Sequence, residues 1–256
     1  MSAERVVVGF DGSLPAVRAL DLAAEEAVLR RAELEIVYAL PDTDAAAPVL
    51  TAAQDRVRAR HPELPTSALP EAGDPARALL RRGRSAALTV VGCREHGGVA
   101  GLLTGSVSRR VIARAHGPVL VARGGRRGRR PAQGGGFVLL IAGGGDVDAA
   151  VFAFAEAQRR GVELRVRHAR MHTPPPALNT TPPRHTAPTP AHPPPPSDTP
   201  RPPRARPAPP AGAPPPPDTG EALLVVAACR PSRGRHTAAR AVLQPADCPI
   251  VLVPAH

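Results

Sequence analysis

The 256-residue sequence has no lysine and no tryptophan, and its only aromatic residues are four phenylalanines and one tyrosine. The absence of lysine excludes a phosphate-binding loop of the Gly-Lys-Ser/Thr type and any chemistry that needs a lysine Schiff base. The scarcity of aromatic rings argues against a protein that binds single-stranded nucleic acid, because such proteins stack bases on aromatic side chains.

Arginine is the only strongly basic residue type, and the formal net charge is +11. A surplus of this size is typical of nucleic-acid-binding proteins. Here, however, five arginines crowd residues 123–130 and four more lie in a proline-rich tract, and all of these except Arg123 fall outside the segments with strand or helix patterns. A GC-rich coding bias also produces this mixture of Arg, Ala, Gly and Pro. We therefore do not expect a nucleic-acid partner.

Cysteine is scarce as well. Cys93, Cys229 and Cys248 are widely spaced and form no C-x-x-C pair, so we expect neither a disulfide framework nor a metal site. Cys93 is expected to be a small core residue rather than a redox-sensitive thiol. No apolar run approaches the length of a membrane span, and the first residues lead into a strand pattern without a signal peptide. These features predict a cytoplasmic protein that does not bind membranes.

Strand and helix patterns alternate through residues 1–124. Strand patterns occupy residues 5–10, 34–40, 66–69, 87–91 and 118–123. Helix patterns lie between them, at residues 15–31 and 49–61, from the Asp74-Pro75 cap onward, and at 106–115. This alternation predicts an α/β fold with a doubly wound, parallel five-stranded sheet of order 3-2-1-4-5.

The second half repeats the first incompletely. Residues 137–141, 148–160 and 161–166 resemble the first strand, first helix and second strand, and residues 222–230 and 248–253 resemble the fourth and fifth strands. We therefore expect a first domain at 1–124, a Gly/Arg-rich hinge at 125–136 and a degenerate second domain at 137–171 plus 219–256. The tract at 172–218 is mainly Pro, Ala, Thr, His and Arg, a composition that predicts a disordered insertion.

The carboxyl ends of the first and fourth strands should meet at the point where the winding of the sheet reverses, which is where such folds bind ligands. Asp11 follows the first strand, and its carboxylate suits a ribose hydroxyl. Gly92 ends the fourth strand, and a helix start at residues 105–107 would offer backbone N–H groups to phosphates. Taken singly, Asp11 could be a helix cap and the glycines could be turn residues. Together they predict a nucleotide site.

The segment Val-Gly-Phe-Asp-Gly-Ser at 8–13, the spacing from Gly92 to Gly105-Ser106 and the Pro-Val-Leu-Val at 118–121 resemble the universal stress protein family in its tandem two-domain form. The family motif G-x2-G-x9-G-[ST] is associated with ATP binding in those members that bind it. The resemblance implies ATP, with or without Mg²⁺, with Asp11 at the ribose, the Val37 backbone at the adenine and the motif at the phosphates. The implied contact residues are Asp11, Gly12, Val37, Gly92, Arg94, Gly105, Ser106 and Val107.

Glu95 stands where the motif has its second glycine. A negative charge about 4 Å from a phosphate costs roughly 1 kcal/mol in water and about 4 kcal/mol at a partly screened surface. The favourable interaction of the phosphate with a helix N-terminus offsets only about 0.3–1 kcal/mol of this cost. The sequence therefore predicts weak ATP binding if Glu95 points inward. The alternative is that Gly97 and Gly98 let the loop turn Glu95 to solvent, with Arg94 as a compensating cation.

The second domain is not expected to bind nucleotide. The position that corresponds to Asp11 falls in the glycine run at 143–145, and Gly92 aligns with Ala227. Asp146 is a less favoured substitute for Asp11. The prediction is therefore one adenine nucleotide, bound by the first domain only.

The expected function is that of a cytoplasmic, nucleotide-binding stress or regulatory protein. No nucleophilic catalyst stands out, so we do not expect an enzyme, although slow ATP hydrolysis with Glu95 as base stays open. The alternative is a nucleotide-free scaffold that engages partners through its proline-rich tract. The resemblance also implies that the fifth strands, 119–123 and 249–253, pair as an internal pseudo-dimer, since an apolar edge strand needs cover. A further homodimer stays open.

Overall fold

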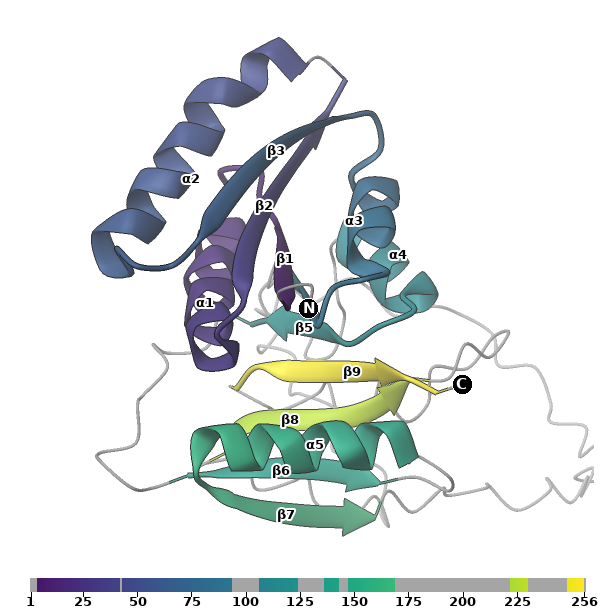
Figure 1. Cartoon of the computed structure of the whole chain (residues 1–256). Helices are drawn as coiled ribbons and strands as arrows, with labels where there is room; N and C mark the ends of the chain where they lie inside the picture. The colour runs from purple at the N-terminus through teal and green to yellow at the C-terminus, as the bar shows by residue number, and fades with distance from the viewer. Residues whose placement is uncertain are drawn as a thin grey trace, which may run out of the picture. The chain divides into compact units, whose positions relative to one another are not determined.

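The computed structural model describes residues 4–41, 43–93, 106–123, 136–142, 147–168, 222–229 and 248–255. Their strands form one sheet of order β3-β2-β1-β4-β5-β9-β8-β6-β7 (Figure 1). The expected hinge and proline-rich insertion lie outside the described residues, apart from the last residue of the hinge. None of the helices in the described ranges is long and apolar enough to cross a membrane.

The first half is the predicted doubly wound unit. Its sheet has the order β3-β2-β1-β4-β5, with all neighbours parallel, which confirms the expected fold class. The elements are β1 (Arg5–Gly9), α1 (Leu14–Arg30), β2 (Glu33–Leu40), the 3-10 helix η1 (Thr43–Ala46), α2 (Ala47–Arg60), β3 (Thr66–Ala72), α3 (Pro75–Gly83), β4 (Leu88–Gly92), α4 (Ser106–Arg114) and β5 (Val119–Ala122).

The second half repeats four of the five strands. It contains β6 (Phe137–Ala142), α5 (Val147–Arg160), β7 (Glu163–His168), β8 (Ala222–Cys229) and β9 (Ile250–Pro254). Their order, β9-β8-β6-β7, corresponds to strands five, four, one and two of the first half. Within the described residues no strand corresponds to β3, so β7 ends the sheet.

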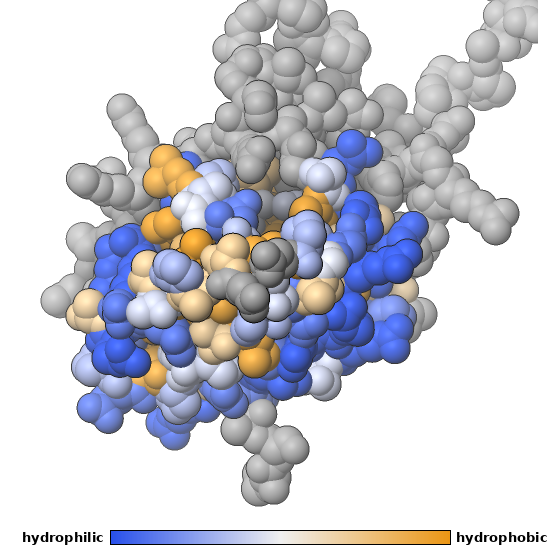
Figure 2. All heavy atoms as spheres, turned by 90° about the horizontal axis from the view of Figure 1, so that it is seen from above, coloured by the Kyte–Doolittle hydropathy of each residue, from blue (hydrophilic) through white to orange (hydrophobic). Residues whose placement is uncertain are grey.

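Residues that alternate along the strands pack into two apolar layers. Val6 and Val8 face the layer that contains α1, α2 and α5, whereas Val7 faces the layer that contains α3 and α4. Alternation of this kind is what a sheet covered by helices on both faces requires. Figure 2, which views the molecule from above Figure 1, shows hydrophobic and hydrophilic residues intermixed on the surface seen there, with hydrophilic residues gathered along its right side.

Two elements differ from the sequence expectation. β3 continues past Leu69 and through Pro70 to Ala72. It can do so because β3 lies at the edge of the sheet, where a strand tolerates proline. In α1, Val28 and Leu29 belong to the apolar period but are 48% and 36% exposed. The buried face of α1 is formed by Leu20, by alanines and by a glutamate–arginine pair.

The two halves join through β5 and β9. These strands pair antiparallel, with Val119 opposite Leu252 and Val121 opposite Ile250. The expected pairing of the fifth strands is therefore present in the structure. It removes both apolar edges from solvent, because every described residue of β5 and the first four residues of β9 are buried.

A cluster of four charged side chains lies beside this junction. Glu26 and Arg30 on α1 pair with Glu156 and Arg160 on α5, so that each carboxylate accepts from both guanidinium groups. The Arg30 Nη2 to Glu156 Oε1 distance is 2.6 Å, and the Glu156 side chain is 0% exposed. Burial alone would lower the pKa of Arg160, but the carboxylates of Glu26 and Glu156 outweigh that effect and raise it.

Removing one carboxylate should destabilise the protein strongly, because it leaves two buried arginines with a single partner. We expect Glu156→Ala to lower the free energy of unfolding by about 3–5 kcal/mol. The matched control is Asp55→Ala, which breaks an ion pair with Arg58 whose side chains are 69% and 62% exposed, and which should cost at most about 1 kcal/mol. Denaturant unfolding monitored by circular dichroism measures both, and equal effects would contradict the assignment.

Candidate functional site

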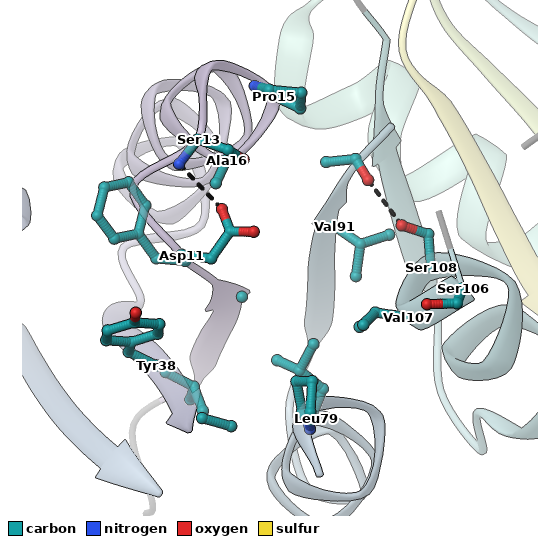
Figure 3. Close-up of a pocket in the computed structure, with 16 residues that line it drawn as sticks. Asp11, Ser13, Pro15, Ala16, Tyr38, Leu79, Val91, Ser106, Val107 and Ser108 are labelled. Atoms are coloured by element: carbon teal, nitrogen blue, oxygen red, sulfur yellow. Dashed lines mark hydrogen bonds between the residues drawn. The ribbon is translucent and has the colours of Figure 1, made fainter. Parts of the chain in front are cut away.

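A pocket of about 440 Å³ opens at the carboxyl ends of β1, β2 and β4, next to the N-termini of α1, α3 and α4 (Figure 3). Asp11 and Ser13 lie on one side of it, and Ser106, Val107 and Ser108 lie on the other. The lining residues are Gly9, Phe10, Asp11, Ser13, Pro15, Ala16, Val37, Tyr38, Ala39, Pro75, Leu79, Val91, Gly92, Ser106, Val107 and Ser108. The pocket is thus the predicted crevice at the switch point of the sheet.

Asp11 is placed by the tight turn between β1 and α1. Its Oδ1 accepts a hydrogen bond from the Ser13 backbone N–H at 3.0 Å. Gly12 sits between them at a φ of +76°, a left-handed conformation that glycine adopts at no steric cost. Gly12 therefore shapes the turn and does not line the pocket, whereas the Asp11 carboxylate faces across it toward β4 (Figure 3).

Gly92 ends β4 where that strand touches the first turn of α1. A Cβ atom at this position would lie 2.7 Å from the Pro15 carbonyl oxygen and 2.8 Å from its carbon. Because that neighbour is backbone, it cannot move aside without shifting the helix. The Gly92 carbonyl also accepts a hydrogen bond from the buried Ser108 Oγ at 2.7 Å. Gly92 is therefore needed first for the close approach of strand and helix.

The N-terminus of α4 forms the opposite wall. Its first residues, Ser106 and Val107, both line the pocket. The first N–H groups of a helix have no partner within the helix and carry the positive end of its dipole. The N-terminus of α1 lines the pocket as well, through Ser13 and Pro15. Among the described residues that line the pocket, Asp11 has the only charged side chain, so backbone groups supply the positive potential.

The end of β2 forms the floor of the pocket, where the family resemblance implied that the Val37 backbone would contact the adenine. The Val37 carbonyl already accepts from the Phe10 N–H at 2.9 Å, and the β1–β2 register ends at Gly9 opposite Val37. The backbone groups of alternate β2 residues point toward β1, as Glu33 and Val37 do. Ala39 is the next residue in that series, and it lies beyond the end of β1. Its backbone therefore faces the pocket more directly than that of Val37.

Asp74 fixes the two helices on the other side. It caps α3 by accepting from the Arg77 N–H at 2.9 Å, and it accepts from both Nη atoms of Arg110 on α4 at 2.7 and 2.8 Å. The side-chain hydrogen bond from Arg110, with the backbone bond from Arg77, holds the pKa of Asp74 below its usual value. Asp74 is therefore ionised near neutral pH and ties the start of α3 to α4.

The structure brings five predicted site residues to one pocket: Asp11, Val37, Gly92, Ser106 and Val107. Arg94 and Gly105 lie outside the described residues, as do Glu95 and the second-half positions 143–146. Sequence reasoning missed Tyr38, Ala39 and Ser108. Of these, only Ser108 could have been predicted from its local sequence. A serine in the first turn of a helix that follows a strand can donate a hydrogen bond to the last carbonyl of that strand, as Ser108 does to Gly92.

Residues 2–123 match the family model described as "Universal stress protein family". This half of the chain belongs to the universal stress protein family. A universal stress protein of Mycobacterium bovis is 33% identical over 202 residues, which are 64% of this chain and 62% of that protein. The chain spans about half the length of other curated relatives that it matches, 45% in the case of a Mycobacterium tuberculosis universal stress protein.

Two solved structures are similar as well. One, a universal stress protein in complex with cAMP, is 33% identical and covers 47% of this chain and 97% of its own, with a TM-score of 0.42. The other, a universal stress protein from Archaeoglobus fulgidus, is 13% identical and covers 99% of both chains, with a TM-score of 0.52. The second likeness concerns the fold alone, and it extends over both halves.

A methyl group at Gly92 should push β4 away from α1 and disturb the pocket. We expect Gly92→Ala to lower the free energy of unfolding by about 1–3 kcal/mol, the usual cost of overpacking. Gly117→Ala is the matched control, because a Cβ there would meet its nearest neighbour, the Gly83 carbonyl oxygen, at an ordinary 3.5 Å. Urea unfolding compares the two. A Gly92 variant as stable as the control would contradict the contact.

Proposed function

We propose that the first domain binds one adenine nucleotide, ATP, and that the protein is a non-catalytic, cytoplasmic stress or regulatory protein whose conformation or partner binding depends on nucleotide occupancy. The observation that carries the proposal is the position of Asp11 opposite the N-terminus of α4 across one pocket. A carboxylate and a set of free backbone N–H groups are what the ribose and the phosphates of one nucleotide require.

Different parts of the pocket lining can contact the ribose, the phosphates and the adenine. The ribose hydroxyls donate to Asp11, and the phosphates accept from the N–H groups of Ser106 and Val107. The adenine lies between the end of β2 and α3, against Leu79 and the ring of Tyr38, with the Ala39 backbone available for its edge. The volume of about 440 Å³ falls within the range that small-molecule sites occupy.

The binding is proposed to be weak. Asp11 is the only charged side chain in the described lining, and its sign repels phosphate. Glu95 adds a second negative charge if its side chain faces the phosphates, as the sequence comparison with the motif indicates. The N-termini of α1 and α4 offset part of this repulsion, at about 0.3–1 kcal/mol each.

Calorimetric titration with ATP and Mg²⁺ should give one site per chain. We expect Asp11→Ala to weaken binding of adenosine by roughly tenfold to a hundredfold, because it loses hydrogen bonds to a charged acceptor worth about 1.5–3 kcal/mol. Adenosine is the sharper probe, since the variant also relieves repulsion of the ATP phosphates. Asp55→Ala, an exposed substitution on α2, is the control and should leave both affinities unchanged.

The same titrations test the remaining parts of the proposal. Glu95→Gly should raise the affinity for ATP and leave that for adenosine unchanged. Phosphate release should stay at background in the native chain and in Glu95→Gln. Submicromolar ATP affinity in the native chain, or two sites per chain, would contradict the proposal. Absence of any binding would favour the competing hypothesis of a nucleotide-free scaffold.

A further inference from the structure

Arg123, the residue that follows β5, holds two buried nitrogen atoms whose hydrogen-bonding needs are unmet. The residue as a whole is partly buried, but its Nε and Nη1 atoms are enclosed, and neither donates to any residue that the structure describes. Polar groups that leave water without gaining a partner are rare in folded proteins, because their desolvation is not compensated. These N–H groups therefore call for a ligand that accepts hydrogen bonds.

The other unpartnered atoms of this kind have a different setting. Arg5 Nε and Glu35 Oε1 also lack hydrogen-bond partners, but the two side chains neutralise each other across 3.1 Å. No carboxylate in the described ranges bonds to Arg123 in the same way. Because a guanidinium binds oxyanions best, the ligand that suits Arg123 is an anion.

The sheet register shows which residues flank Arg123. On the β4 side lies Cys93, whose backbone N–H continues the ladder by donating to the Ala122 carbonyl at 3.1 Å. On the other side, the antiparallel register of β5 with β9 places Cys248 opposite Arg123. Both cysteines are buried, and a neutral thiol is a weak acceptor. The strand neighbours given by the register therefore bring no carboxylate to the guanidinium.

Arg123 stands on the face of the sheet that α4 covers. Alternation along β5 places it with Val119 and Val121, which pack in the layer of α3 and α4. Helix α4 begins at the same end of the sheet, since Ser108 in its first turn donates to the Gly92 carbonyl at 2.7 Å. A cation is repelled by the positive end of a helix dipole. An anion between Arg123 and the start of α4 would be attracted by both.

The order of the strands places Arg123 at the phosphate end of the proposed nucleotide. The sheet runs β2-β1-β4-β5. In the proposed binding mode, the adenine lies at β2, the ribose at Asp11 after β1, and the phosphates at β4 and the start of α4. β5 is the next strand in that direction, about 4.8 Å farther. Arg123 lies outside the described lining of the pocket, so only a chain of phosphates that continues past Gly92 reaches it.

We propose that Arg123 binds the terminal phosphate of a nucleoside di- or triphosphate, a proposal that rests on the nucleotide site proposed above. Phosphate oxygens would satisfy the N–H groups that have no partner, and the site would prefer ATP to AMP. The repeat supports this role. Matching Gly117-Pro118 before β5 with Cys248-Pro249 before β9 places Pro254 at the position of Arg123. The arginine is thus present in the half that holds the pocket and is replaced in the other.

Calorimetric titration of the full-length chain with AMP and with ATP, each with Mg²⁺, tests this preference. The native chain should bind ATP more tightly than AMP. Arg123→Gln should weaken ATP binding by roughly tenfold to a hundredfold, the loss expected for hydrogen bonds to a charged group, and should leave AMP binding unchanged. The matched control is Arg114→Gln, which removes the same charge from an exposed position on α4 and should change neither affinity.

Thermal unfolding without nucleotide separates a ligand contact from a structural role. Arg123→Met removes buried N–H groups that have no partner, so its unfolding midpoint should be equal to or higher than that of the native chain. Inorganic pyrophosphate should raise the native midpoint, because it binds the folded state, and should leave the midpoint of Arg123→Met unchanged. A clear fall of the midpoint in ligand-free Arg123→Met would overturn the proposal, because the side chain would then serve the fold.

The same measurements distinguish this proposal from the nucleotide site itself. If adenosine and ATP bind but Arg123→Gln and Arg114→Gln have equal affinities for ATP, the Arg123 contact is wrong and the nucleotide site stands. If adenosine does not bind but pyrophosphate raises the midpoint only when Arg123 is present, the anion contact stands and the proposed nucleotide is overturned.

Discussion

The antiparallel pairing of β5 with β9 is the contact on which the rest of the structure depends, because it turns two partial sheets into one. The second half alone has four described strands and a single described helix, and it buries few large side chains outside the sheet. Joined to β5, β9 becomes an interior strand, and β7 is the edge strand that remains in the described part of this half. The cluster of Glu26, Arg30, Glu156 and Arg160 fixes the same junction one layer above, where each charge pairs with two opposite ones in the cluster and Glu156 pairs with Arg159 as well.

Such a cluster specifies geometry more than it adds stability. Desolvation of four charges costs nearly as much as their attraction returns, and an apolar replacement of similar volume is often no less stable. A misaligned helix, however, would leave a buried charge without a partner, which is far more costly. The cluster therefore favours one relative position of α1 and α5. The other end of α1 is positioned by local contacts, the turn at Asp11 and Ser13 and the close approach of Gly92 to Pro15, and there these residues form one wall of the pocket.

The fold was predictable because alternating strand and helix patterns constrain topology strongly. The order of the first five strands and the pairing of the fifth strands both follow from the sequence pattern and the family resemblance. The charged cluster was not predictable, because Glu26/Arg30 and Glu156/Arg160 have the i, i+4 spacing of an ordinary solvent-exposed helix pair. Only the junction of the halves reveals that these pairs face one another.

The residues of the pocket likewise include some that the sequence predicted and some that it could not predict. Asp11, Gly92 and Ser106 could be assigned to the pocket from sequence, because turn-forming residues and glycine indicate where strands end and helices begin. The choice between Val37 and Ala39 could not, because it depends on where β1 stops relative to β2, a matter of register that local sequence does not encode. Gly92 gives the opposite lesson. The sequence points to this glycine through its place in a phosphate motif, whereas the structure shows that a side chain there would collide with the Pro15 backbone.

The two halves differ in which surfaces are left exposed to solvent. In the first half α2 is held to α1 by Asp21, and β3 completes the sheet, so the surface is closed and the open feature is the pocket. In the second half the counterpart of Asp21 is Val151, and the counterpart of buried Ile36 is exposed Val166. Loss of a charge and gain of apolar exposure at matched positions are both changes that favour contact with another surface. These changes leave the junction of the halves undisturbed, because β9, which pairs with β5, lies at the opposite edge of the second-half strands from β7.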